Sequence, residues 1–348
     1  MKRILHINFD VYKDSKVSHK VGGVPCAIQN IINYLSTVNK HNLLTLDSSI
    51  KDPVINNGNY IFPNLNKSYF SSFLRSPLRV FWSFKDVDIF VFHHLPPLKV
   101  LMLFRILFPF RKIFCFVYTK QSLKFERYLS MIDLFVTTDT ILQSNLLEVQ
   151  YPKNKLKAIG VIPDIDYYDI QKNKIPFDFF SNNSKIWYSA GPRKEMGYEV
   201  FVNEILQDVE KRNNYRITLL GESEVKVGEE IRGMSNVEIG KMYTSVPEAM
   251  AGVDVMAYLI TDHMHKMHMP LMALESLLMK RVVISTLSGG MPCLFNDKNC
   301  IPVQKDHGFL EVYKTYSRQD LLNLVEQGYK DAKDYSNRVI NEMEEIFL

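Results

Sequence analysis

Residues 267–286, MHMPLMALESLLMKRVVIST, place an apolar helical pattern directly before an apolar strand pattern. Pro270 suits the first turn of a helix, because its fixed φ is helical and its missing N–H would have no intrahelical partner there. Three leucines then follow at helical spacing on one side: Leu271, Leu274 and Leu278. The stretch therefore predicts a helix that packs on a core and leads into a buried strand.

A single glutamate lies inside the apolar side of this helix. Glu275 is four residues from Leu271 and three from Leu278, whereas Ser276 and Lys280 fall on the opposite side. Burying a carboxylate without a partner is costly. Glu275 is therefore expected to have a partner, which is either a ligand or a buried cation of the protein.

Apolar runs of strand length recur along the whole chain. In the first half they occupy residues 3–9, 42–46, 87–92, 112–119, 133–138 and 157–162. In the second half they occupy residues 185–190, 215–220, 237–240, 253–259, 281–286 and 299–303. Helical patterns separate these runs, and the alternation predicts parallel α/β sheets.

A polar segment with proline and asparagine, residues 164–185, separates the two sets of runs, and we interpret it as a linker. A chain of 348 residues also exceeds the usual size of one core. We therefore expect an α/β protein of two Rossmann-like, doubly wound domains, residues 1–165 and 166–332, facing a central cleft. Residues 317–348 predict two helices, and the last, about 333–348, is expected to pack back on the first domain.

The composition is that of an ordinary globular protein, with 46% hydrophobic and 23% charged residues. The net charge of +4 and the pI of about 8.6 favour an anionic partner, such as a phosphate or a lipid headgroup, and do not require nucleic acid. The four cysteines form no CxxC pair, which argues against a zinc site or a disulfide framework. No secretory signal precedes Asp10, so we expect a cytoplasmic protein.

The best candidate for membrane contact is residues 98–114. Arg105 and Pro109 interrupt this apolar segment well short of the length of a membrane-spanning helix. It predicts either a core helix followed by a strand, or a basic and aromatic surface lying on an anionic membrane.

Small or basic residues follow three of the predicted strands. Gly22 and Gly23 precede one predicted helix, Arg193 and Lys194 precede another, and a Ser-Gly-Gly loop occupies residues 288–290. A helix N-terminus beside glycine or a cation suits a phosphate, although each pattern by itself also fits an ordinary turn. In parallel sheets these three loops share the edge at which ligands bind.

The histidines allow several interpretations. His93 and His94 end the run at 87–92, and one of them could act as a base or contact a sugar, or both could be strand-end histidines bonded to backbone groups. The cluster DHMHKMH at 262–268 lacks a metal-site spacing, and we interpret it as a polar loop.

In this order, the segments resemble the retaining family 4 of the GT-B glycosyltransferases, which use nucleotide sugars. Residues 21–35 resemble the family's GG loop and first helix, and residues 161–166 resemble the segment before its interdomain linker. SAGPRKEMG at 189–197 resembles its donor-phosphate motif, and residues 267–292 resemble its signature, in which two glutamates are separated by seven residues. The resemblance runs over nearly the whole chain and is strongest from 185 to 300.

The resemblance implies transfer of a sugar from a UDP- or GDP-sugar to a glycan or lipid-linked acceptor, with retention, in surface polysaccharide biosynthesis at the inner face of the cell membrane. It implies no metal or other cofactor. The first domain would bind the acceptor and the second the donor.

The same resemblance implies the roles of individual residues. Glu275 would bind the ribose hydroxyls, Arg193 and Lys194 the diphosphate, and Gly22 and Gly23 would approach the diphosphate from the first domain. The remaining donor-binding candidates are Lys241, Met242, Met269, Pro270 and Leu271.

His94 and Lys120 are the catalytic candidates on the acceptor side. Two departures from the family pattern leave other functions open: Met267 stands in place of the first glutamate, and Met196 stands where a lysine is usual. A catalytically inactive GT-B scaffold subunit is the first alternative, and a GT-B sugar-nucleotide epimerase is the second.

Overall fold

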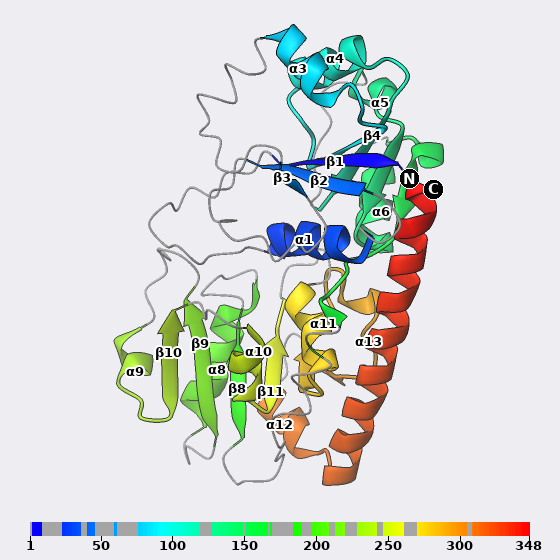
Figure 1. Cartoon of the computed structure of the whole chain (residues 1–348). Helices are drawn as coiled ribbons and strands as arrows, with labels where there is room; N and C mark the ends of the chain where they lie inside the picture. Colours follow the sequence, from blue (N-terminus) through cyan, green and yellow to red (C-terminus); the bar gives the residue numbers. More distant parts are fainter. Residues whose placement is uncertain are drawn as a thin grey trace. The chain divides into compact units, whose positions relative to one another are not determined.

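A computed structural model of the chain describes residues 2–8, 23–35, 40–45, 59–60, 76–118, 127–148, 151–165, 168, 184–189, 196–208, 213–219, 228–241, 246–260, 270–304 and 308–348. The chain divides into two compact units, which are described separately (Figure 1). Unit 1 comprises residues 1–162, 266–268 and 338–348, and unit 2 comprises residues 163–265 and 269–337.

Unit 1 is built on a parallel sheet with the strand order β3-β2-β1-β4-β5-β6-β7. Its strands are β1 (Arg3–Asn8), β2 (Lys40–Thr45), β3 (Asn59–Tyr60), β4 (Ile89–His93), β5 (Lys112–Val117), β6 (Leu134–Thr137) and β7 (Leu156–Ala158). The six predicted apolar runs of the first half are confirmed as strands. The two-residue β3 was not predicted, because a strand this short carries too few residues for an alternation to appear.

The helices of unit 1 lie between these strands along the chain. They are α1 (Gly23–Leu35), α3 (Pro77–Phe84), α4 (Leu98–Leu107), α5 (Arg127–Met131), α6 (Thr140–Glu148) and the 3₁₀ helix η1 (Lys153–Lys155). In α4, Leu101 and Phe104 are buried in the core, and β5 follows directly. Residues 98–114 therefore include a helix that packs on the core and the strand that follows it, as the first interpretation predicted. Met102, Ile106 and Phe110 of the same segment are exposed, so contact with a membrane stays a prediction.

Unit 2 contains a second parallel sheet, with the order β10-β9-β8-β11-β12-β13. Its strands are β8 (Lys185–Tyr188), β9 (Asn214–Leu219), β10 (Val237–Lys241), β11 (Val255–Tyr258), β12 (Val282–Ser285) and β13 (Ile301–Pro302). All six predicted runs of the second half are confirmed as strands.

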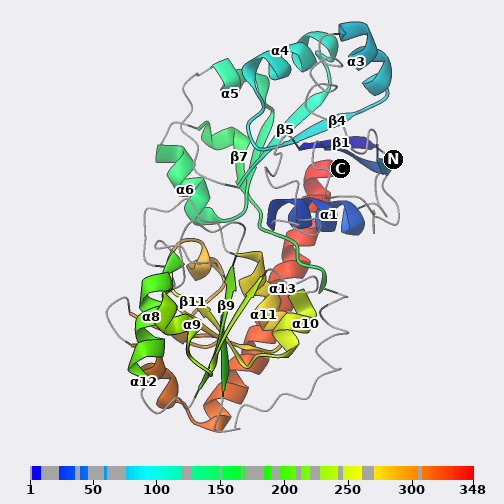
Figure 2. The ribbon, with the colours of Figure 1, turned by 90° about the vertical axis from the view of Figure 1, so that its left-hand side faces the viewer.

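Helices cover both faces of this second sheet. They are α8 (Tyr198–Gln207), α9 (Glu229–Arg232), α10 (Val246–Ala251), α11 (Leu271–Leu278), the 3₁₀ helix η3 (Met291–Cys293), α12 (Phe309–Lys314) and α13 (Arg318–Phe347). In Figure 2, α8 and α12 lie on one side of the sheet and α11 and α13 on the other. This two-sided covering is the doubly wound architecture predicted from the sequence.

The prediction of two helices at the C-terminal end is wrong, because α13 is one helix of 30 residues. Gly328 lies within it without ending it. A Cβ atom at this position would stand 2.8 Å from Leu277 Cδ2 and 3.3 Å from the Asn299 carbonyl oxygen. The glycine thus permits close packing of α13 on α11. In the described part of the chain, no helix combines the length and the apolar character needed to cross a membrane.

The helix α11 is buried on more than its leucine side. Ser276 is completely buried, although it falls opposite the leucines of this helix. Its hydroxyl donates to the Met272 carbonyl oxygen at 2.6 Å and lies 3.2 Å from the Tyr258 hydroxyl. A small side chain that bonds to its own helix can be buried on any side, so the helical pattern did not reveal the burial.

Candidate functional site

In unit 2 the strand order reverses between β8 and β11, which is where parallel sheets of this kind bind ligands, at the carboxyl ends of the strands. Ser189 directly follows β8 at this point, and Leu259 directly follows β11. The next described helix along the chain after β11 is α11. The chemistry at this edge is carried by α11 and by the start of α8.

Glu275 on α11 is 7% exposed and has a hydroxyl as its partner. Burial raises the pKa of this carboxyl group to about 7; a hydrogen bond from Tyr168 opposes the rise, and the nearby Asp164 carboxylate adds to it. Among the described residues, no ion pair of Glu275 is found. The buried cation that was one of the two expected partners is therefore not the partner seen in the described part of the structure.

A chain of hydroxyls holds α11 against the strand ends. The Tyr258 hydroxyl at the end of β11 lies 3.2 Å from Ser276 Oγ and also bonds to Ser189, which follows β8. All three side chains are buried, and burial raises the pKa of Tyr258. Because Ser276 is the residue after Glu275, this network fixes the helix segment that carries the carboxylate.

The start of α8 is brought to the same point by a glycine. Gly197 has φ of 79° and caps α8, and a Cβ atom there would stand 1.9 Å from the Leu259 carbonyl oxygen. The Met196 carbonyl oxygen accepts from the Tyr188 hydroxyl at 3.1 Å, and the Met196 side chain is buried. The N–H groups of the first turn of α8, and its positive dipole end, thus lie next to the end of β11.

In unit 2, three of the other predicted donor-binding residues are at least partly described. Pro270 is the N-cap of α11, one residue before the predicted position, and Leu271 is the buried first residue of that helix. Lys241 ends β10, two strands from β8 at the same sheet edge. Arg193, Lys194, Met242 and Met269 lie outside the described residues.

In unit 1 the strand order reverses between β1 and β4, and two histidines lie on these strands. His6 Nδ1 is 3.0 Å from His93 Nε2, and His93 Nδ1 is 2.8 Å from the Tyr118 hydroxyl. All three side chains are buried. Burial, followed by repulsion from His94, lowers the pKa of His93 to about 3, so this imidazole is neutral and needs one donor and one acceptor among its neighbours.

The predicted catalytic residue His94 follows β4 directly. Its φ is 76°, its backbone N–H donates to the Phe116 carbonyl oxygen at 2.9 Å, and its ring centroid is 5.1 Å from that of Tyr118. Its partly exposed side chain thus lies beside the His6–His93–Tyr118 network. Gly23 opens α1, whereas Gly22 and Lys120 lie outside the described residues.

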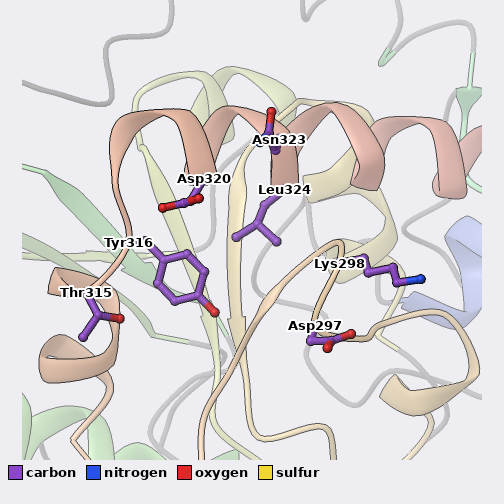
Figure 3. Close-up of a pocket in the computed structure, with 7 residues that line it drawn as sticks. All are labelled: Asp297, Lys298, Thr315, Tyr316, Asp320, Asn323 and Leu324. Atoms are coloured by element: carbon purple, nitrogen blue, oxygen red, sulfur yellow. The ribbon is translucent and has the colours of Figure 1, made fainter.

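A shallow pocket of about 340 Å³ lies elsewhere in unit 2 (Figure 3). Asp297 and Lys298 precede β13, and Tyr316 lies between α12 and α13, so the pocket is at the amino-terminal edge of the sheet. It is separate from the edge that carries Glu275. Among the described residues, no group of three or more histidine, cysteine, aspartate or glutamate side chains could hold a metal ion.

The sequence matches no protein-family profile and no curated protein. Solved structures do share its fold. A glycosyltransferase from Rickettsia africae ESF-5 has a TM-score of 0.77 at 14% identity, covering 99% of this chain and 97% of that chain. HepE of Anabaena in complex with UDP-glucose has a TM-score of 0.71 at 14% identity, covering 100% and 99%.

A third similar structure is the catalytic domain of starch synthase IV from Arabidopsis thaliana, bound to ADP and acarbose. Its TM-score is 0.68 at 12% identity, with 99% of each chain covered. These three are GT-B glycosyltransferases, and the present chain has the GT-B fold of two Rossmann-like domains.

Several site residues were not predicted from the sequence: Ser189, Tyr258, Tyr168, His6 and Tyr118. Four of them share one signal, because Tyr258, Ser189, His6 and Tyr118 are polar groups within or just after buried strands. Tyr168 carries no such signal, since it lies in the segment interpreted as a linker.

Proposed function

We propose that the protein is a nucleotide-sugar-dependent glycosyltransferase. It transfers a sugar from a UDP- or GDP-sugar to a glycan or lipid-linked acceptor, with retention of the anomeric configuration. The acceptor is a precursor of a surface polysaccharide. The protein acts at the inner face of the cell membrane, in contact with anionic lipid.

Glu275 carries this proposal. It is a buried carboxylate at the strand-order reversal of unit 2, held by one hydroxyl. The two ribose hydroxyls of a nucleotide are donors of the same kind as the Tyr168 hydroxyl. The similar structures support this assignment, because HepE was solved with UDP-glucose and starch synthase IV with ADP.

The diphosphate belongs at the start of α8 in this proposal. Gly197 brings the first turn of that helix to the end of β11, and Arg193 and Lys194 precede it by a few residues. Helix N–H groups and guanidinium or ammonium groups together neutralise a diphosphate that gains charge as it leaves. The reaction then requires no metal ion.

The reaction exchanges one bond for another at the sugar C1. The bond from C1 to the diphosphate oxygen breaks, the bond from C1 to the acceptor oxygen forms, and the acceptor proton passes to the leaving phosphate. His94 and Lys120 are assigned to the acceptor side, where they orient the hydroxyl that attacks.

The alternative of an inactive scaffold subunit rests on Met196 and Met267. The Met196 side chain is a neutral thioether and is buried, so it supplies no cation to a phosphate. The test is to incubate the purified protein with a panel of nucleotide sugars and candidate acceptors. Released nucleotide with transferred sugar supports the transferase, isomerised sugar supports the epimerase, and nucleotide binding without either product supports the scaffold.

A further inference from the structure

Exposed large apolar side chains gather on two helices of unit 1. Among the described residues, six of the nine exposed large apolar side chains lie between positions 78 and 110. They are Leu78, Phe81, Trp82, Met102, Ile106 and Phe110. We call this set the α3–α4 face. Leu147, Leu206 and Leu348 are the other three, in α6, in α8 and at the chain end.

The apolar positions form one stripe on each helix. On α3, Leu78, Phe81 and Trp82 recur at spacings of three and four, and the stripe continues to Lys85. On α4, Lys99 begins the stripe of Met102 and Ile106. Each helix thus presents an exposed apolar stripe with a lysine at one end.

The α3–α4 face rests on a rigid base. The helices lie side by side in both ribbon views (Figures 1 and 2), and their opposite sides bury Val80, Phe84, Leu101 and Phe104 in the core of unit 1. The Phe81 and Phe108 rings are stacked with centroids 5.9 Å apart. The exposed side chains are therefore held in place by packing and do not need to fold on contact with a partner.

The charge around this face is positive. Residues 76–112 contain six basic and two acidic residues, and both acids have basic partners. Asp86 pairs with Arg3 at 3.3 Å, and Asp88 pairs with Arg111 at 2.9 Å. Neither α3 nor α4 contains an acidic residue.

The basic residues divide into structural and exposed groups. Arg105 donates to the Met131 and Arg111 carbonyl oxygens and pairs with Asp133 at 2.5 Å, so it is part of the fold. Four cations are exposed instead: Arg79, Lys85, Lys99 and Lys112. Lys85 lies over the Trp82 ring, 4.5 Å from its centroid, and within the described residues no ion pair is found for the other three.

We propose that the α3–α4 face docks on an anionic lipid bilayer, with Trp82, Ile106 and Phe110 entering the headgroup region and the four exposed cations contacting lipid phosphates. Two helices that carry exposed aromatic, aliphatic and basic side chains and no acidic residue are complementary to such a surface. The inference rests on the proposed function, because a lipid-linked acceptor is met at the membrane, and it assigns that contact to particular residues.

Trp82 provides a direct readout. The chain has two tryptophans; Trp187 is buried, whereas Trp82 is 63% exposed. Adding vesicles of phosphatidylcholine and phosphatidylglycerol should shift the emission of Trp82 to shorter wavelength, and vesicles of phosphatidylcholine alone should shift it far less. The shift should disappear in Trp82→Phe, although this variant still sediments with anionic vesicles.

Two sets of variants test the surface by sedimentation with the same vesicles. Trp82→Ser, Ile106→Ser and Phe110→Ser together should abolish binding, whereas the matched control, Leu147→Ser with Leu206→Ser, should not. Arg79→Gln, Lys99→Gln and Lys112→Gln should together weaken binding on the order of a hundredfold at low salt. Lys298→Gln, Lys314→Gln and Lys330→Gln, which remove three exposed cations from unit 2, should leave binding nearly unchanged.

The outcome is independent of catalysis, because no nucleotide or acceptor is present. If the wild type binds the vesicles but transfers no sugar, the docking surface is supported and the proposed function is not. Absence of vesicle binding, or equal binding by the surface and control variants, would overturn the lipid assignment. If the wild type does not bind vesicles and a variant of the α3–α4 face changes the oligomeric state, the face instead contacts a second copy of the chain.

Discussion

The most informative residue of the molecule is a carboxylate whose partner is a hydroxyl. Glu275 has a pKa of about 7 because burial outweighs the hydrogen bond from Tyr168. Near neutral pH both the protonated and the charged form of Glu275 are therefore populated. A ligand that donates two hydroxyl groups favours the charged form, since only that form has all its lone pairs available as acceptors.

Replacing Glu275 with glutamine should weaken nucleotide diphosphate binding about tenfold to a hundredfold at pH 8, because hydrogen bonds to a charged group contribute roughly 1.5–3 kcal/mol. In the wild type the affinity should rise from pH 6 to pH 8, as the proton leaves, and Glu275→Gln should lack this rise. Titration calorimetry with UDP and GDP measures both effects. Glu204→Gln is the matched control, since Glu204 is also buried in unit 2 but accepts from the Leu310 N–H.

The same carboxylate predicts a pH dependence of stability. Its pKa rises from 4.5 in the unfolded chain to about 7 in the folded protein, so the folded state holds the proton more tightly between these values. As the pH rises from 4.5 to 7, the free energy of unfolding should fall by roughly 3 kcal/mol relative to Glu275→Gln. Urea unfolding of both proteins at pH 5 and pH 8 gives this difference. A variant that is less stable than wild type at pH 8 would mean that a cation pairs with Glu275.

At the scale of elements, both sheets position their chemistry through the strands beside the order reversal. In unit 2 the hydroxyl network from Ser189 to Ser276 joins β8, β11 and α11, and Gly197 seats α8 against the end of β11. In unit 1 the His6–His93–Tyr118 network joins β1, β4 and the end of β5.

Gly197→Ala should displace the start of α8. A Cβ atom would overlap the Leu259 carbonyl oxygen and the backbone would remain in the left-handed region, so the loss of stability should be about 2–4 kcal/mol. Nucleotide diphosphate binding should weaken with it. Gly228→Ala is the control, because no atom lies within 4 Å of the added Cβ, and it should change stability by less than about 1 kcal/mol. Chemical denaturation compares the two, and equal losses would contradict the close approach.

The histidine network should make unit 1 sensitive to acid. His93 has a pKa of about 3 when folded and 6.5 when unfolded, so below pH 6.5 the unfolded chain takes up a proton that the folded protein does not. Wild type should therefore lose about 1.4 kcal/mol of stability for each pH unit below 6.5, relative to His93→Gln. His6, His94 and Tyr118 are present in both proteins, so the comparison isolates the change at His93. A stability difference that is constant from pH 7.5 to pH 5 would contradict this explanation.

At the scale of the molecule, the chain ends meet in one unit. The last residues of α13 belong to unit 1, where Phe347 is buried with its ring centroid 6.1 Å from that of His6 and 6.0 Å from that of Phe114. Lys2 Nζ donates to the Leu348 carbonyl oxygen, and Lys157 pairs with Glu345 at 3.8 Å. The C-terminal residues thus complete the core that β1 begins.

Phe347→Ala should therefore destabilise unit 1 by about 3–5 kcal/mol, although it lies one residue from the end of the chain. Phe110→Ala is the matched control, since Phe110 is 97% exposed and should change stability by no more than about 0.5 kcal/mol in solution. Thermal unfolding of the two variants measures the difference. Similar melting temperatures would show that the end of α13 does not contribute to the core.

The sequence by itself determined the twelve strand runs and the two doubly wound sheets. Apolar runs and helical spacing are local properties, which can be recognised without knowing the tertiary neighbours of a segment. It also indicated that Glu275 is buried, since the leucines around it define one side of a helix. It did not indicate the continuity of α13. There a glycine, a weak helix former, is kept by the close approach of Leu277 and Asn299, which are distant in sequence.

Only the tertiary structure decided what the polar residues contact. The His6 to His93 bond joins residues 87 positions apart, and Tyr168 reaches Glu275 from a segment without a regular pattern. It also decided that Arg105 is bound within the fold while Trp82 and Phe110 face outward. The physical reason is that a hydrogen bond or an exposed face depends on which elements become neighbours, whereas the propensity for a strand or a helix is already present in a few consecutive residues.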